Sequence, residues 1–191
     1  MKRKNQKAGS VIGVIALIAI VILTFYYYFV NHAPSKETED QAMTETEQIL
    51  TYDFEENYPQ TSKETVKLFA RIMKALYNDP EEKEIEPLAL KIRGLYDKEF
   101  LENNPQEAYL NNLKTDIAQW KKADRRITNY LLVKEEQDQE KEVDGVKYSV
   151  NYISYTIQEN GKFTETWKVL LRQDQDMKWK ILGWEYESKD E

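Results

Sequence analysis

The sequence contains no cysteine and a single histidine, His32. Without cysteine the chain can form neither a disulfide nor a thiolate metal site, which excludes zinc–cysteine and iron–sulfur centres. His32 lies in a polar stretch outside every predicted folded element, so a Ser-His-Asp triad and a histidine metal centre are excluded as well. We therefore expect no chemistry that depends on a thiol or an imidazole.

Glycine is also scarce, with six residues in the whole chain. Neither G-x-x-x-x-G-K-S/T nor G-x-G-x-x-G occurs, so no phosphate-binding loop is predicted. Two acid-rich stretches, 135–144 and 174–176, lack the D-x-[DN]-x-[DN]-G spacing of a calcium loop. The sequence thus predicts no metal, no cofactor and no catalytic residue.

Negative charge outnumbers positive charge after the N-terminus. The net charge is −7, and because the first seven residues hold four cations, about −11 remains for the rest. A surface this acidic repels nucleic acid and anionic lipid headgroups. One basic cluster lies beside Trp120 and comprises Lys121, Lys122, Arg125 and Arg126. It could stack a single strand on Trp120 or complement the C-terminal dipole of a helix, and the acidic context favours the second interpretation.

The one long apolar run extends from Ala8 to Val30 without a charged residue. As a helix it would be about 34 Å long, enough to cross a ~30 Å hydrocarbon core. The predicted flanks of this anchor are Lys2, Arg3, Lys4 and Lys7 before it, and Tyr26, Tyr27 and Tyr28 at its outer end. The positive-inside rule then predicts a cytoplasmic N-terminus. A cleaved signal peptide is the alternative, but the run is long for one and no small-x-small cleavage pattern follows.

These features predict a single-pass protein of the cell membrane, with a signal-anchor and an extracytoplasmic domain outside the cell. The expected divisions are a basic cytoplasmic tail over 1–7, the anchor over 8–30, a polar linker over 31–44 and a folded domain over 45–188. An exported domain without disulfides is typical of a Gram-positive bacterium. The predicted contacts are a lipid bilayer through 8–30 and a protein partner or second copy, with no nucleic acid.

The hydrophobic pattern after the linker changes from helical to alternating. Helices are predicted over 45–57, 61–77, 82–95 and 105–122. Thr61 and Glu64 have the spacing of a capping box. Strands are predicted over 127–134, 147–158, 163–172 and 178–186, and Asn160-Gly161 is a strong hairpin signal. This order predicts an α+β fold in which three to four helices pack on a curved four-stranded antiparallel sheet.

One acid occupies an apolar register of the third predicted strand. Glu165 shares a face with Phe163, Trp167, Val169 and Leu171. If it is buried there, its pKa would rise and it could act as a general acid or base, or hold a polar ligand. The alternative is an exposed Glu165 near the hairpin end, paired with a cross-strand lysine, since charged residues are rarely buried unless paired.

The last predicted strand carries the other candidate residues. In a regular strand Trp179 would point to one face of the sheet, whereas Trp184 and Tyr186, after Gly183, would point to the other. This change of face predicts a bulge or a sheet covered on both faces. If they are exposed, these aromatic residues mark a surface for a partner. The predicted partner surface or pocket comprises Trp184, Tyr186, Trp167 and Glu165.

Several motifs resemble those of known families. The order of helices before strands, with a closing Trp179-Lys180-Ile181-Leu182-Gly183-Trp184, resembles the NTF2-like (cystatin-like) cone. Glu56-Asn57-Tyr58-Pro59 is similar to a family of uncharacterised single-pass membrane proteins of clostridial bacteria, as are Leu95-Tyr96-Asp97 and Tyr109-Leu110. The resemblance implies an NTF2-like extracytoplasmic domain behind one membrane span, and it implies no particular activity.

NTF2-like folds host both enzymes and pure binding domains, so the fold alone does not decide the function. We expect a membrane-anchored binding or assembly module with no enzymatic activity. Two alternatives stay open. One is a small-ligand-binding or ketosteroid-isomerase-like cone centred on Glu165. The other is a VirB8-like subunit of a transfer apparatus, which shares the layout of anchor, linker and domain.

Overall fold

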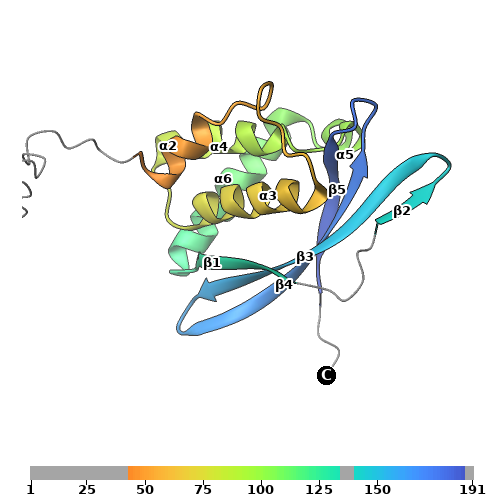
Figure 1. Ribbon diagram of the computed structural model, residues 1–191. Helices are drawn as coiled ribbons and strands as arrows, with labels where there is room; N and C mark the ends of the chain where they lie inside the picture. Colours follow the sequence, from red (N-terminus) through yellow and green to blue (C-terminus); the bar gives the residue numbers. More distant parts are fainter. Residues whose placement is uncertain (1–42, 134–139, 188–191) are drawn as a thin grey trace, which may run out of the picture. The chain divides into compact units, whose positions relative to one another are not determined.

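The computed structural model describes residues 43–133 and 140–187 (Figure 1). The described residues belong to one compact unit, Met43–Glu191. In this unit the helices come first along the sequence and the strands follow, so the fold is α+β.

Residues 43–133 and 140–187 contain no helix that is both long and apolar enough to cross a membrane. The longest described helix, α6 (Gln106–Lys122), has 17 residues and carries several charged side chains, whereas a span needs about 20 apolar residues. This finding contradicts three predictions: the transmembrane helix, the single-pass signal-anchor and the placement of the domain outside the cell. The predicted anchor over 8–30 and its bilayer contact lie outside the described residues. So do the predicted flanks of the anchor, which are Lys2, Arg3, Lys4, Lys7, Tyr26, Tyr27 and Tyr28.

Five helices are described, whereas three to four were expected. They are α2 (Glu45–Leu50), α3 (Ser62–Tyr77), α4 (Glu82–Arg93), α5 (Lys98–Asn103) and α6. The unexpected helix is α5, which begins where the Asp97 side chain accepts a hydrogen bond from the Glu99 backbone amide at 2.9 Å. It was missed because it is short and fully buries none of its side chains, so it leaves no periodic apolar signal.

The N-terminus of α3 was predicted from its capping residues, and this prediction is confirmed. The Thr61 hydroxyl accepts a hydrogen bond from the Glu64 amide, and the Glu64 carboxylate accepts one from the Thr61 amide, both at 3.1 Å. Two backbone donors that the helix cannot satisfy internally are thereby satisfied.

The sheet is antiparallel and has five strands, which corrects the expected four. The strands are β1 (Arg126–Val133), β2 (Glu140–Val143), β3 (Val146–Gln158), β4 (Lys162–Gln173) and β5 (Trp179–Tyr186). Their order is β1-β3-β4-β5, and β2 also pairs with β3. Strand β2 was missed because all four of its residues are exposed and three are charged, so it lacks an alternating apolar pattern.

The hairpin between β3 and β4 was predicted at Asn160-Gly161, and the structure confirms it. Both residues have positive φ, 48° for Asn160 and 154° for Gly161. Asparagine and glycine are the residues that adopt such φ values at least cost. The hairpin pairs Glu165 of β4 with Tyr155 of β3, which brings two inward-facing polar groups side by side.

Strand β5 contains the bulge that its phase change predicted. Leu170 of β4 lies opposite Gly183, but Leu171 lies opposite Ile181, so Leu182 is the extra residue. Because of this extra residue, Trp184 lies on the inner face of the sheet. It is opposite Val169, whose side chain is fully buried. A bulge also increases local twist, in keeping with the strongly coiled sheet in Figure 1.

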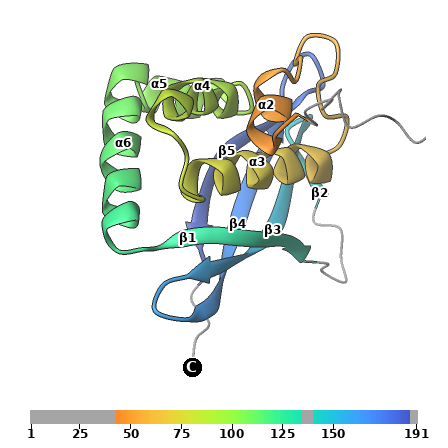
Figure 2. The same ribbon diagram turned by 90° about the vertical axis from the view of Figure 1, so that its left-hand side faces the viewer.

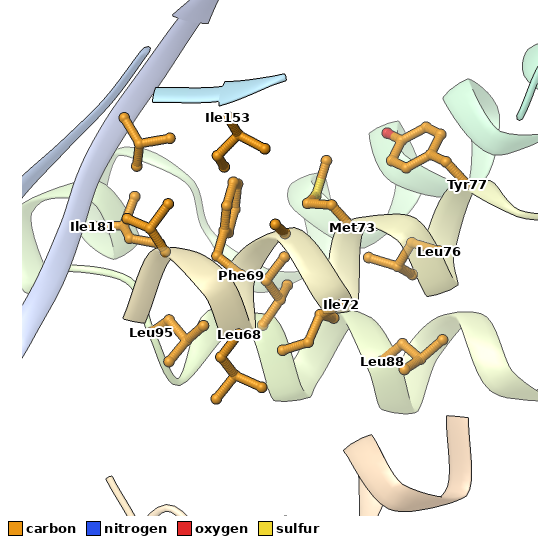
Figure 3. Packing of buried hydrophobic residues seen from close by; sticks show 14 of the residues in the cluster. Leu68, Phe69, Ile72, Met73, Leu76, Tyr77, Leu88, Leu95, Ile153 and Ile181 are labelled. Carbon is orange, nitrogen blue, oxygen red and sulfur yellow. The ribbon is translucent and has the colours of Figure 1, made fainter. Parts of the chain in front are cut away.

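Helix α3 is the centre of the hydrophobic core. It contacts β1, β3 and β5 on one side and α4 on the other, and Figure 2 shows it between the sheet and the other helices. Phe69 points toward Ile153 of β3, whereas Ile72 lies toward α4 and Leu88 (Figure 3). All four of these side chains are fully buried. The helix therefore joins the two layers of the fold.

A short segment between α4 and α5 attaches the helices to the last strand. The Asp97 amide donates to the Ile181 carbonyl and the Ile181 amide donates to the Leu95 carbonyl, both at 2.8 Å. The buried Asp97 carboxylate also accepts hydrogen bonds from Arg172 of β4, at 3.1 and 2.5 Å. These contacts hold the segment Leu95–Asp97 along one edge of the sheet.

We expect the substitution Phe69→Ala to lower the free energy of unfolding by about 3–5 kcal/mol, because it leaves a cavity between α3 and the sheet. Chemical denaturation followed by circular dichroism measures this loss. Lys67→Ala, at an exposed position of the same helix, is the matched control and should change stability by less than about 0.5 kcal/mol. Equal losses in the two variants would contradict the central position of Phe69.

Candidate functional site

An ion pair joins the helical layer to the sheet at the hairpin end of β3 and β4. The Arg125 guanidinium donates to Glu165 Oε1 at 2.6 Å and lies 3.7 Å from Glu159 Oε2. Arg125 is held in place where the chain leaves α6, because its amide donates to the Trp120 carbonyl at 2.9 Å. The residue before it, Asp124, has a positive φ of 49°, which turns the backbone from α6 into β1.

Aromatic rings enclose this arginine. Its guanidinium carbon lies 4.3 Å from the ring centre of Trp120 and 5.8 Å from that of Phe163. Cations in such positions are attracted to the face of the ring. The face of Trp120 that could have stacked a nucleic-acid base therefore carries Arg125.

Neighbouring cations of the predicted basic cluster are also engaged within the protein. Lys121 donates to the Pro80 carbonyl at 2.6 Å and pairs with Asp79 at 3.1 Å. Arg126 pairs with Asp124 at 3.1 Å. These contacts favour a structural role at the end of α6, and the absence of nucleic-acid binding stays a prediction.

Glu165 matches neither of its two expected environments in full. Its side chain is 24% exposed, so it is largely buried but not isolated, and its partner is an arginine from the α6–β1 turn rather than a lysine across the strand. One carboxylate oxygen binds Arg125. The other, Oε2, is buried and has no hydrogen-bond partner among the described residues.

Three further polar atoms near Glu165 share this condition. Within the described parts of the chain, the buried atoms Arg125 Nε, Tyr155 OH and Trp167 Nε1 also have no hydrogen-bond partner. Tyr155 lies opposite Glu165 in the strand register, and its ring centre is 4.8 Å from that of Trp167. We call Arg125, Tyr155, Glu165 and Trp167 the Arg125 cluster. It is a contiguous group of side chains with unmet hydrogen bonds.

Tyr186 lies at the exposed rim of the cluster. Its ring packs edge-on against Trp167 with 5.1 Å between the centres, and the residue is 63% exposed. Partial burial and the nearby charge of Glu165 raise the pKa of the Tyr186 phenol, and Arg125 acts in the opposite direction. Tyr186 therefore connects the buried cluster with solvent.

The four residues predicted to form a partner surface or pocket are only partly brought together. Glu165, Trp167 and Tyr186 belong to one region, whereas Trp184 is half-buried and packs against other residues. Its ring packs on three aromatic rings with centre distances of 5.1–5.7 Å, namely those of Phe69, Tyr96 and Phe100. Trp184 is thus part of the packing between α3, α5 and β5.

Sequence reasoning missed Arg125 and Tyr155 as members of the site. Tyr155 alternates with Ile153 and Ile157, so its inward direction could have been inferred from the period of two. Arg125 gave no such signal. Its direction depends on the turn at Asp124 and on a contact with a strand 40 residues away.

Arg125 also lines a small cleft between the C-terminal ends of α3 and α6. The cleft has a volume of about 90 Å³ and is lined in part by Tyr77, Ile117, Trp120 and Lys121. The Tyr77 hydroxyl donates to Asp116 at 2.5 Å, and burial, followed by this hydrogen bond, raises the pKa of the phenol. The cleft thus has both aromatic and polar walls.

Two larger grooves lie elsewhere. One, of about 440 Å³, runs between α3, the loop before it and Tyr130 of β1. The other, of about 630 Å³, includes Asp97, Arg172 and the half-buried Lys180, whose pKa is lowered by burial. Lys180 donates to the Gly94 carbonyl at 2.8 Å, so its amine is engaged in holding the fold.

The chain matches the family described as Domain of unknown function (DUF6715) over residues 1–184, and it belongs to that family. No curated protein matches the chain. The family assignment covers nearly the whole sequence and names no activity.

We expect Glu165→Ala to lower the free energy of unfolding by about 1–3 kcal/mol, because Arg125 then stays largely buried without its main partner. The matched control is Glu185→Ala, which removes an exposed partner of Lys168 and should cost less than about 0.5 kcal/mol. Urea denaturation of both variants tests the difference. Similar losses would show that the Arg125–Glu165 pair behaves like a surface pair.

Tyr155→Phe should leave stability at neutral pH unchanged or raised, because the substitution removes a buried hydroxyl that has no partner. Burial raises the pKa of this phenol well above its usual range. The unfolded chain ionises near pH 10, so the stability that the neutral phenol contributes is present below about pH 10 and is lost above it. Denaturation at increasing pH should therefore show a shallower alkaline loss for Tyr155→Phe than for the parent. A marked loss of stability at pH 7 would contradict the unpartnered hydroxyl.

Proposed function

We propose that this protein is a binding module with no enzymatic activity and that the Arg125 cluster holds its ligand. The observation that carries this proposal is that each of the four residues of the Arg125 cluster, two of which form an ion pair, has one buried polar atom without a partner among the described residues. A buried polar group without a hydrogen bond costs about 1–3 kcal/mol, so a ligand that supplies missing partners would stabilise the cluster.

The chemistry of these atoms defines the ligand. Arg125 Nε and Trp167 Nε1 are donors, Glu165 Oε2 is an acceptor, and the Tyr155 hydroxyl can act as either. The charge of Arg125 is already balanced by Glu165 and Glu159, so the ligand need not bring a charge. A compact uncharged group that both accepts and donates hydrogen bonds, such as a primary amide, matches this set.

The surroundings of the cluster support a ligand of small size. Of the cluster residues, Arg125 alone lines the adjacent cleft of about 90 Å³ between α3 and α6, which has room for a few non-hydrogen atoms. Tyr186 is exposed above Trp167 and provides an aromatic rim. Aromatic walls with a few placed polar groups are typical of small-molecule sites.

Catalysis by Glu165, as in a ketosteroid-isomerase-like cone, has less support. Glu165 is already engaged by Arg125 through one carboxylate oxygen, which favours a binding role over that of a free general base. The chain also has no cysteine, and its single histidine, His32, lies outside the described residues. These features support binding rather than turnover.

An NTF2-like architecture is part of the proposal. It is supported by the order of helices before a coiled antiparallel meander and by the packing of α3 on one face of that sheet. A clostridial origin is likewise a prediction, supported by the motif Glu56-Asn57-Tyr58-Pro59. Neither point identifies the natural ligand.

The proposal is tested by NMR of the four tryptophan indole N–H groups during titration with acetamide. We expect the Trp167 signal to shift in a saturable way, because the amide carbonyl can accept from Trp167 Nε1 while its NH₂ group donates to Glu165. Trp184 is the internal reference because it packs on Phe69 and Phe100 instead. Sodium acetate and methylammonium chloride, which carry a charge, should shift Trp167 far less.

Glu165→Gln should weaken acetamide binding about tenfold, which corresponds to about 1.4 kcal/mol, because the acceptor that receives the amide N–H is altered. Glu185→Gln, at an exposed position of β5, is the matched control and should leave the titration unchanged. The absence of a saturable Trp167 shift with acetamide in the folded parent protein would overturn the proposal.

A further inference from the structure

The described sheet has three strand edges without a full neighbouring strand, and they differ in how they are protected. Strands β1 and β2 both lie on the outer side of β3, and β5 lies at the other end of the sheet. An exposed edge offers unpaired backbone N–H and C=O groups to another strand, so proteins usually block it with charge or with a covering segment. Two of the three edges follow this rule.

The β2 edge is protected by charge, since Glu140, Lys141 and Glu142 are three of its four residues. The β5 edge is covered at Ile181 by the segment Leu95–Asp97, which makes two backbone hydrogen bonds with that residue. Both arrangements oppose the addition of a further strand.

Among the described residues, the edge of β1 has neither protection. From Ile127 to Val133 it contains no charged residue, no proline and no glycine. Leu131 is 65% exposed and Val133 is 42% exposed, both on the outer face of the sheet. The neighbour of Leu131 on β3 is Ser154, whose small side chain leaves the leucine uncovered. This edge combines free backbone groups with uncovered apolar side chains.

We propose that β1 is a self-association edge, at which a second copy of this chain adds its own β1 in antiparallel orientation. Ile127–Val133 carries no charge, so two copies of this segment can pair without placing like charges opposite one another. Pairing about a two-fold axis at Leu131 places each Leu131 opposite its counterpart and Tyr130 opposite Leu132. Antiparallel neighbours at such positions bring their side chains into contact.

The groove beside this edge has room for the inward side chains of the second copy. It measures about 440 Å³, and its lining includes Tyr130 of β1 and Leu68 of α3. In the paired arrangement the copy's Tyr130 and Leu132 would enter this groove. With a net charge of −7 on each chain, two copies repel one another elsewhere, which leaves the uncharged edge as the favoured contact.

Sedimentation velocity of the full chain over a wide range of concentrations tests this interface. We expect the parent chain to dimerise and Leu131→Lys to stay monomeric, because two like charges would face one another across the axis. Leu170→Lys is the matched control. It lies on the outer face of the interior strand β4 and is 38% exposed, so it should leave dimerisation unchanged.

Cross-linking gives a second readout that does not depend on the tolerance of the fold for a lysine. The chain has no cysteine, so a single introduced thiol reports on one position. Under mild oxidation Leu131→Cys should form a covalent dimer, because the two β-carbons approach disulfide distance, whereas Leu170→Cys should not. A monomeric parent, a Leu131→Lys variant that still dimerises, or equal cross-linking at both positions would each overturn the proposal.

Discussion

The two-sided burial of α3 is the constraint on which the rest of the structure depends. Phe69 packs on Ile153 of the sheet and Ile72 packs toward Leu88 of α4, so a single helix connects both layers. Because interiors are close-packed, the position of α3 determines where the neighbouring elements can lie. The end of α3 also packs on α6, where the ring centres of Tyr77 and Trp120 lie 4.6 Å apart, close to the turn that carries Arg125.

The Arg125 cluster has a structural role, and the same residues carry the proposed ligand site. The Arg125–Glu165 contact of 2.6 Å joins the end of α6 to the β3–β4 hairpin. The same contact leaves one carboxylate oxygen and one guanidinium nitrogen buried without partners, beside Tyr155 and Trp167. Natural proteins tolerate such local cost mainly where function requires it, which is the physical reason for placing the ligand here.

Much of the fold could be predicted from local patterns. The capping residues of α3, the hairpin at Asn160-Gly161 and the bulge before Trp184 each depend on a few neighbouring residues, and each is confirmed. The short helix α5 and the strand β2 could not be predicted, because neither buries enough apolar surface to impose a period on the sequence. The expected membrane span is corrected by the absence of any sufficiently long apolar helix in 43–133 and 140–187.

The candidate site was only half predictable. By itself the sequence determined the α+β class, the absence of thiol chemistry, and the presence of one acid among the inward aromatic residues of β4, because these follow from composition and from a period of two. Only the tertiary structure decided that Glu165 meets Arg125, that Tyr155 lies beside it, and that Trp184 instead packs against Phe69. Such contacts join residues far apart in the chain, and their geometry depends on turns and packing that no local pattern encodes.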